Sequence, residues 1–284
     1  MSATVCDLVG QRVVSGGIEV DIPEPGTAVT AQTSGDVGAH YLHVDVAKSG
    51  LISVDTSEPE LRYTELLKDG SSRHLEASET LSDLALAYSR CSDWSYSTSA
   101  WFSPSIFYLN SSERRPSNIS KSAFESIAVA SLSTWKNGTN GCGISPALDV
   151  PGSISYGNWT YDGNFTSAGG CGARDSRNVI DWGPLAGEVL GLTCTWLING
   201  APVEKDIRLD TSGRSWVTTA TGCSGAYDVR SALTHEMGHG LALGNAAENG
   251  GNDLTMSPNI STCNTSARVL GAGDVTAIYV QHGG

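Results

Sequence analysis

The segment ALTHEMGHGLALGN at residues 232–245 carries the pattern from which the fold can be predicted. His235 and His239 are four residues apart, about one helical turn, so on a helix both imidazoles leave the same face and can share one metal ion. Glu236 lies beside them and can act on a metal-activated water. The pattern predicts a zinc site in which Glu236 takes up a proton as general base and passes it to the leaving amine.

The short pattern alone also arises by chance in unrelated helices, so the residues around it must be considered. These surroundings support a metal site. The helix is expected from about Asp228, which would be its N-cap, through Leu243. Cys223 and Cys263 flank it, and Met256 follows it. We interpret the helix as one part of a larger site.

Two further helices and several strands are expected outside this segment. Residues 121–135 form an amphipathic helix with apolar side chains at spacings of three and four, capped by Ser120 or Ser122. A third helix is expected at residues 274–280, with Asp274 as N-cap. Strands are expected at residues 101–109, 178–182, 192–197 and 205–209.

The first 90 residues have a different pattern. Residues 11–56 alternate between apolar and polar in the manner of half-buried strands, and residues 57–90 are charged and helix-permissive. We therefore divide the chain into a β-rich N-terminal module and linker at residues 1–90, either a propeptide or an accessory domain, and a second domain at residues 91–284.

Composition excludes several partners. The chain has 284 residues, 17 basic against 30 acidic, and a formal net charge of -13. Such a charge repels nucleic acid and anionic lipid, and no run of apolar residues is long enough to cross a membrane. Acidic loops could bind structural calcium, although no Asp-x-Asp-x-Asp-Gly loop occurs.

The cysteines indicate an oxidising compartment. Seven are spread widely, with no Cys-x-x-Cys pair, which favours disulfides over a zinc knuckle. Six lie between residues 91 and 263, enough for three bridges in an unspecified pairing, and Cys6 is left as the odd thiol. We expect a secreted, extracellular protein.

The chain resembles the matrixin branch of the metzincin metalloproteases, in particular the secreted bacterial type. The resemblance covers about residues 91–280 and depends on four features in the family's order. These are the strand and helix at 101–135, EKDIRL at 204–209, the segment 228–243, and LTMSP at 254–258 followed by LGAGDV at 270–275.

The resemblance implies an α+β fold with a twisted mixed sheet beside the active-site helix. It implies that His235 and His239 bind zinc, that Glu236 is the general base and that Met256 forms a Met-turn under the metal. It also implies a monomeric endopeptidase that cleaves extracellular proteins and binds its protein or peptide substrate in extended form.

Two positions depart from the family's signature His-Glu-x-x-His-x-x-Gly-x-x-His. Ala242 stands in place of the glycine, and because alanine resists the left-handed conformation, the helix is expected to run on to Gly244. Asn245 stands in place of the third histidine and is the candidate third ligand, with a weaker amide donor.

Other outcomes stay open at this stage. A water or another side chain could complete the site, and the few candidates downstream are Glu248, Asp253, Asp274 and His282. The alternative function is a catalytically impaired metzincin-fold binding module, a pseudoprotease that lost its third ligand. A cysteine switch through Cys6 is not expected, because TVCDL at residues 4–8 does not match the matrixin switch motif.

Overall fold

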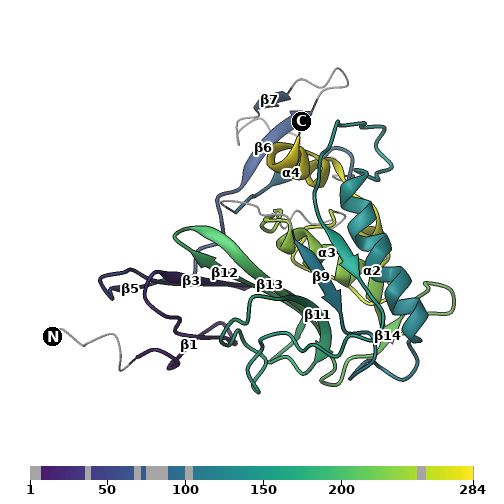
Figure 1. Ribbon diagram of the computed structural model, residues 1–284. Coiled ribbons are helices and arrows are strands. Elements are labelled where there is room, and N and C mark those ends of the chain that lie inside the picture. Colours follow the sequence, from purple (N-terminus) through teal and green to yellow (C-terminus); the bar gives the residue numbers. More distant parts are fainter. Residues whose placement is uncertain are drawn as a thin grey trace.

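The computed structural model describes residues 8–35, 40–66, 72–74, 89–99, 105–247 and 254–283 (Figure 1). Within them the fold is α+β, with a mixed sheet of eight strands and three α-helices, so the predicted class is confirmed. The strands lie in the order β10 (Ser153–Ser155), β9 (Ile106–Leu109), β11 (Asn178–Gly183), β13 (Ala201–Asp210), β12 (Val189–Ile198), β3 (Thr27–Gly35), β4 (Tyr41–Val46) and β5 (Ile52–Asp55).

The helices gather beside the sheet (Figure 1). α3 packs against β3, β12 and β13, while α2 packs against α3 and β10. The helices are α2 (Lys121–Lys136), α3 (Val229–Gly240) and α4 (Ala272–His282), with a 3₁₀ turn at Ser266–Arg268. Short additional strands are β1 (Arg12–Ser15), β2 (Ile18–Asp21), β6 (Arg62–Leu66), β7 (Ser72–His74), β8 (Ser95–Tyr96), β14 (Trp216–Val217) and β15 (Tyr227–Asp228).

Strand direction changes within the sheet at β12. β9 pairs in parallel with β10 and β11, and β11 pairs in parallel with β13. β12 is antiparallel to both of its neighbours, β13 and β3. The strands predicted near residues 178, 192 and 205 are confirmed, and the one predicted at 101–109 is shorter, because it begins at Ile106 and residues 101–104 lie outside the described residues.

The predicted helix at residues 121–135 is confirmed and shows why its sequence folds there. Ser120 is the N-cap, and its side chain accepts a hydrogen bond from the backbone N–H of Ala123 at 3.1 Å. The apolar stripe buries Phe124, Leu132 and Trp135 in the main core between the helices and the sheet. α2 thereby forms a fixed wall behind α3.

The N-terminal strands continue the sheet of the later residues. β3 pairs with β12 along its whole length, from Gly35 opposite Val189 to Thr27 opposite Ile198. Alternate residues of β3 and β4, including Val29, face a second apolar core on the side of the sheet away from α3. The boundary predicted near residue 91 is therefore not a boundary of the sheet, and as a division into folding units it stays a prediction.

Three disulfides close loops in the later part of the chain. They join Cys91 to Cys142, Cys171 to Cys194 and Cys223 to Cys263. The prediction of three bridges among these six cysteines is confirmed, while Cys6 lies outside the described residues. No helix in the described ranges is long and apolar enough to span a membrane.

Candidate metal centre

Helix α3 is held rigidly at its N-terminus and along its length. Asp228 is the N-cap as predicted, accepting from the backbone N–H of Ser231 at 2.7 Å, and it also forms an ion pair with Arg268. The indole of Trp135 on α2 donates to the backbone carbonyl of Thr234 at 2.8 Å. The part of α3 that carries the histidines is thus held by Trp135 of α2 and, at its N-terminus, by Arg268.

The two imidazoles are oriented by backbone carbonyls. Nδ1 of His235 lies 2.8 Å from the carbonyl oxygen of Thr255, and Nδ1 of His239 lies 2.9 Å from that of Leu243. A carbonyl oxygen only accepts, so each Nδ1 carries the proton and each Nε2 carries the lone pair when the ring is neutral. The two Nε2 atoms face each other at 3.0 Å.

Burial keeps both rings neutral. It lowers the pKa of His235 to about 4, and it also lowers the pKa of His239, with a further contribution from neighbouring His235. Two lone pairs at 3.0 Å repel each other unless a cation lies between them. Nitrogens that bind one tetrahedral zinc at about 2.0–2.1 Å lie about 3.3 Å apart, so the pair fits such an ion.

Glu236 is fully buried and points at the sheet, away from bulk water. Its Oε1 accepts from the hydroxyl of Ser34 on β3 at 2.6 Å, and its Oε2 lies 2.7 Å from the hydroxyl of Thr193 on β12. Burial raises the pKa of Glu236 to about 7, although both hydroxyls act to lower it. A carboxyl with this pKa can exchange a proton near neutral pH.

The close approach of Glu236 to β12 requires a glycine at position 191. A Cβ placed on Gly191 would lie 2.4 Å from Oε1 of Glu236. The pairing of β12 with β3 also shifts register between Val189 and Gly191. The strand therefore leaves room for the carboxyl at this point only because it has no side chain there.

The Met256 turn packs against helix α3 between the two histidines. Met256 is buried against Gly238, between the two histidines along the helix, where an added Cβ would meet the methionine Sδ at 2.3 Å. The carboxylate of Asp274 accepts from the backbone N–H groups of Thr255 at 2.6 Å and Met256 at 2.9 Å. The Thr255 carbonyl that orients His235 is thus held in place from α4.

The prediction that Asp274 is an N-cap is wrong by three residues. α4 begins at Ala272 with Gly271 as N-cap, and Asp274 accepts from the backbone N–H of Gly271 at 2.7 Å from within the first turn. This arrangement could not be predicted from the sequence, because glycine offers no capping side chain. Asp274 accepts hydrogen bonds both from the backbone at the start of the helix and from the Met256 turn. Its carboxylate is committed to these bonds.

The expected extension of the histidine-bearing helix to Gly244 is also wrong. α3 ends at Gly240, and Ala242 adopts the left-handed conformation with φ of +68°. The backbone N–H of Leu243 closes the end by donating to the carbonyl of Gly238 at 3.0 Å. The turn is therefore made despite the alanine, at a cost of about 1–2 kcal/mol for a left-handed residue with a side chain.

Asn245 follows this turn and is nearly buried. Its backbone carbonyl accepts from the hydroxyl of Ser97 at 2.9 Å, and its Nδ2 donates to Glu58 at 3.1 Å. With Nδ2 committed to Glu58, the remaining oxygen Oδ1 has no hydrogen-bond partner within the described ranges. An orphaned buried oxygen is the donor that a third ligand position needs, although ligation by Asn245 stays a prediction.

The other ligand candidates are not gathered with the histidines in the part of the chain that is described. No group of three or more His, Cys, Asp or Glu side chains is placed there to hold a metal ion. The ring of His282 lies 3.3 Å from the carbonyl of Leu241, and Asp274 is used by the Met256 turn. Glu248 and Asp253 lie outside the described residues.

A cavity of about 220 Å³ opens beside His239. Burial lowers the pKa of Lys205 in its wall to about 7 and raises that of Tyr41 to about 12. His43 is half-buried, with its Nδ1 2.8 Å from the Thr30 hydroxyl. These side chains come from β3, β4 and β13, so the N-terminal strands form part of the site's surroundings.

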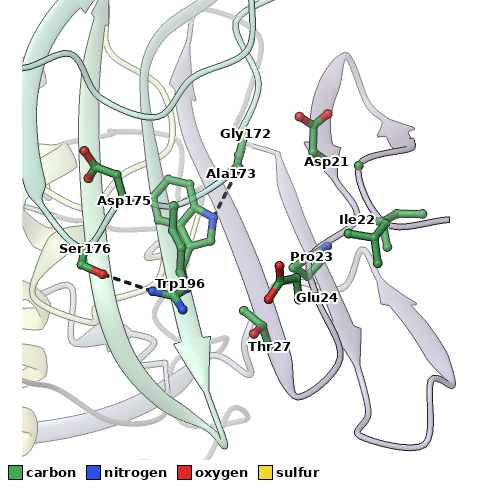
Figure 2. A pocket seen from close by; sticks show the side chains of 13 residues that line it. Asp21, Ile22, Pro23, Glu24, Thr27, Gly172, Ala173, Asp175, Ser176 and Trp196 are labelled. Carbon is green, nitrogen blue, oxygen red and sulfur yellow. Dashed lines mark hydrogen bonds between the residues drawn. The ribbon is translucent and has the colours of Figure 1, made fainter. Parts of the chain in front are cut away.

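A larger cavity, about 400 Å³, is lined by neither imidazole, and Figure 2 shows its walls. It is lined by residues 21–24, the start of β3 and the loop at 172–176. The indole of Trp196 forms one wall and donates to the carbonyl of Gly172 at 3.1 Å. No histidine or cysteine is among the residues that line this cavity, so it is separate from the candidate metal centre.

Sequence reasoning missed three residues of the site: Ser34, Glu58 and Thr193. Ser34 is 202 residues from its partner Glu236, and Glu58 is 187 residues from Asn245. No motif or periodicity marks a single polar residue in a strand as a partner of a distant helix. Strand alternation is the signal that could have helped. It places Thr193 and its neighbour Leu192 on opposite faces of the sheet, and both are buried.

Comparisons with known proteins add no family. No family model matches the chain, and no curated protein matches its sequence.

Proposed function

We propose that the chain is a zinc-dependent endopeptidase of the metzincin type, resembling the matrixins. The observation that carries the proposal is the pair of neutral imidazoles whose Nε2 lone pairs meet at 3.0 Å. Backbone carbonyls fix both Nδ1 atoms as donors, so the pair is preorganised for a cation. Glu236 follows His235 on the same helix, and Met256 packs beneath it.

Each residue has a distinct task in this proposal. His235 and His239 hold the zinc, and the free Oδ1 of Asn245 supplies the third donor. Zinc, when bound, supplies a Lewis acid that polarises the scissile carbonyl and acidifies water. Glu236 takes a proton at its carboxylate and delivers it to the leaving amine, a role suited to its pKa of about 7.

The substrate we propose is an extended segment of an extracellular protein. Three disulfides support an oxidising environment, which is where extracellular protein substrates are found. A binding module of the same fold would need no general base, and the buried, oriented Glu236 favours the enzyme over that alternative.

Zinc content measured by elemental analysis tests the proposal. Wild type, Asn245→His and Asn245→Ala are compared, with His40→Ala as the control imidazole outside the candidate metal centre. We expect about one zinc per chain in wild type and His40→Ala, tighter binding in Asn245→His and loss in Asn245→Ala. A wild type without zinc, combined with an Asn245→His variant that binds it, would instead support the decayed site of a binding module.

A further inference from the structure

The cavity beside His239 lies over a row of polar side chains that the strand register sets. Thr195 of β12 lies opposite Lys205 of β13 on one side and opposite Thr30 of β3 on the other. Thr30 in turn lies opposite His43 of β4. Directly opposed residues share a face of the sheet, so the four side chains form one row across neighbouring strands, and all four line the cavity. In Figure 1, purple β3 lies beside green β12 and β13.

The other side of the cavity is formed by the end of α3 and by apolar groups. His239 lies in the last turn of this helix, and Ala242 lies in the turn that follows it. Leu197 of β12 adds an isobutyl group to the lining. At about 220 Å³ the cavity is smaller than the ~300–1,000 Å³ typical of sites for drug-sized ligands. An occupant is therefore small, with a short apolar body.

Two buried side chains supply hydrogen-bond donors to this cavity. Lys205 and Gln32 both line it, and their exposed fractions are 2% and 3%. Nε2 of Gln32 has no hydrogen-bond partner within the described residues, and a buried donor left in this state costs about 1–3 kcal/mol. An ammonium group has three N–H donors and accepts no hydrogen bond. The occupant that these groups favour carries hydrogen-bond acceptors.

The charge of the lining favours an anion over a neutral acceptor. The chain has 30 acidic against 17 basic residues, yet no aspartate or glutamate is among the described residues that line the cavity. Lys205 is the lining residue that can carry a full positive charge at its ordinary pKa. Burial lowers that pKa to about 7, and an anion beside the ammonium favours its charged form.

We propose that this cavity is a binding site for a short aliphatic carboxylate. Its oxygens accept hydrogen bonds from Lys205 and Gln32, and its hydrocarbon part lies against Leu197 and Ala242. The site adjoins His239 but needs no metal, so it does not depend on the function proposed above. The same carboxylate chemistry is offered by a free acid and by the glutamate side chain of a peptide.

Isothermal titration calorimetry on the full chain tests the proposal. Butyrate is compared with its neutral match butyramide and with the cation butylammonium, at constant ionic strength, in zinc-loaded and in chelator-treated protein. Lys205→Met removes the charge and keeps the length of the side chain, and Gln32→Met removes the unpartnered donor. Lys48→Met is the matched control, because it makes the same change of charge at an exposed lysine after β4.

We expect wild type to bind butyrate with a Kd of about 1–10 mM, and butyramide and butylammonium at least about tenfold more weakly. Lys205→Met should weaken butyrate binding about tenfold or more, and Gln32→Met about three- to tenfold. Lys48→Met should leave the Kd unchanged. The Kd should be measurable with and without zinc, because the donors belong to the sheet.

Two capped tripeptides distinguish the sources of the carboxylate. An acetylated and amidated Ala-Glu-Ala peptide is titrated against the butyrate complex, with Ala-Gln-Ala as its neutral match. Displacement by the glutamate peptide alone would assign the site to an acidic side chain of a peptide. Displacement by neither peptide would assign it to a free acid, and both results support a carboxylate site.

Three results would overturn the inference. The first is equal affinity of wild type for butyrate and butyramide, and the second is undiminished butyrate binding by folded Lys205→Met and Gln32→Met variants. The third is binding that needs zinc and is unchanged in both variants, which would place the carboxylate on the metal. If Lys205→Met does not fold, as judged by circular dichroism, the neutral ligand and Gln32→Met decide. Absence of zinc from all samples would refute the proposed function alone, since butyrate binding is also measured without metal.

Discussion

The half of the site built by α3 and the Met256 turn differs from the half built by β3 in how far apart its parts lie along the chain. His235 and His239 are 4 residues apart, and the carbonyl that orients His235 is 20 residues away. Ser34, in contrast, lies 202 residues from Glu236. The first half is encoded by short spacing on one helix, whereas the second depends on how the whole sheet is assembled.

The largest effect should come from Glu236, which belongs to α3 and accepts a hydrogen bond from Ser34 of β3. Glu236→Gln keeps the shape of the side chain but removes the proton acceptor, so we expect the rate of casein hydrolysis to fall about 10²–10⁴-fold or more. Zinc content should stay the same, because Glu236 is not one of the proposed ligands. Exposed Glu60→Gln is the control and should leave the rate unchanged. Loss of zinc together with activity would show that the carboxyl serves metal binding instead.

The next effect tests how closely the helix and the Met256 turn fit. Gly238→Ala would bring a Cβ within 2.3 Å of Met256 Sδ and 2.9 Å of Trp135, whereas at Gly240 the nearest atom is 3.3 Å away. Both changes gain similar helix propensity, so the pair isolates overpacking. We expect Gly238→Ala to be less stable than Gly240→Ala by about 1–3 kcal/mol in urea unfolding. Equal stability would mean that Met256 is free to move.

These differences explain which features the sequence could predict. The helix at residues 121–136 and the start of α3 follow from apolar spacing and from the caps Ser120 and Asp228, which act within a few residues. The count of three bridges followed from composition. Ala242 was misread because its left-handed φ is imposed by the turn beyond it, against its own preference.

The role of β3 could not be predicted for a related reason. Its alternation shows that it is a strand, but no local rule says which strand it pairs with across more than 150 residues of chain. The same limit applies to Glu58, whose contact with Asn245 spans 187 residues. A charged residue in an exposed segment carries no sign of its partner, so only the assembled sheet reveals it.

A smaller effect should separate the long-range contact from an ordinary buried hydrogen bond. In the zinc-free protein the folded-state pKa of Glu236 is about 7, above its ordinary 4.5, so its contribution to stability is present below pH 4.5 and lost as the pH rises through 7. Ser34→Ala removes a donor to the ionised form and raises this pKa further. We expect a destabilisation of about 1.5 kcal/mol at pH 8 and clearly less at pH 5.

Ser97→Ala is the matched control for this pH dependence. Ser97 is equally buried, but its hydroxyl donates to the uncharged backbone carbonyl of Asn245. Its loss should cost about 0.5–1.5 kcal/mol at both pH values. Urea unfolding of both variants at pH 5 and pH 8 measures the difference. A Ser34→Ala cost that does not change with pH would show that Glu236 is not the group that the hydroxyl stabilises.

The smallest effect concerns the turn that ends helix α3. Ala242 has a φ of +68°, a conformation that glycine adopts without steric cost, so Ala242→Gly should stabilise the protein by about 0.5–1 kcal/mol after the entropy lost by glycine is counted. Ala246, outside the left-handed region, is the control, and Ala246→Gly should destabilise. Thermal unfolding of the two variants measures both signs. If Ala242→Gly also destabilised, the alanine methyl would be contributing packing that outweighs the strain, and the turn would be held by its side chain as well as by its backbone bonds.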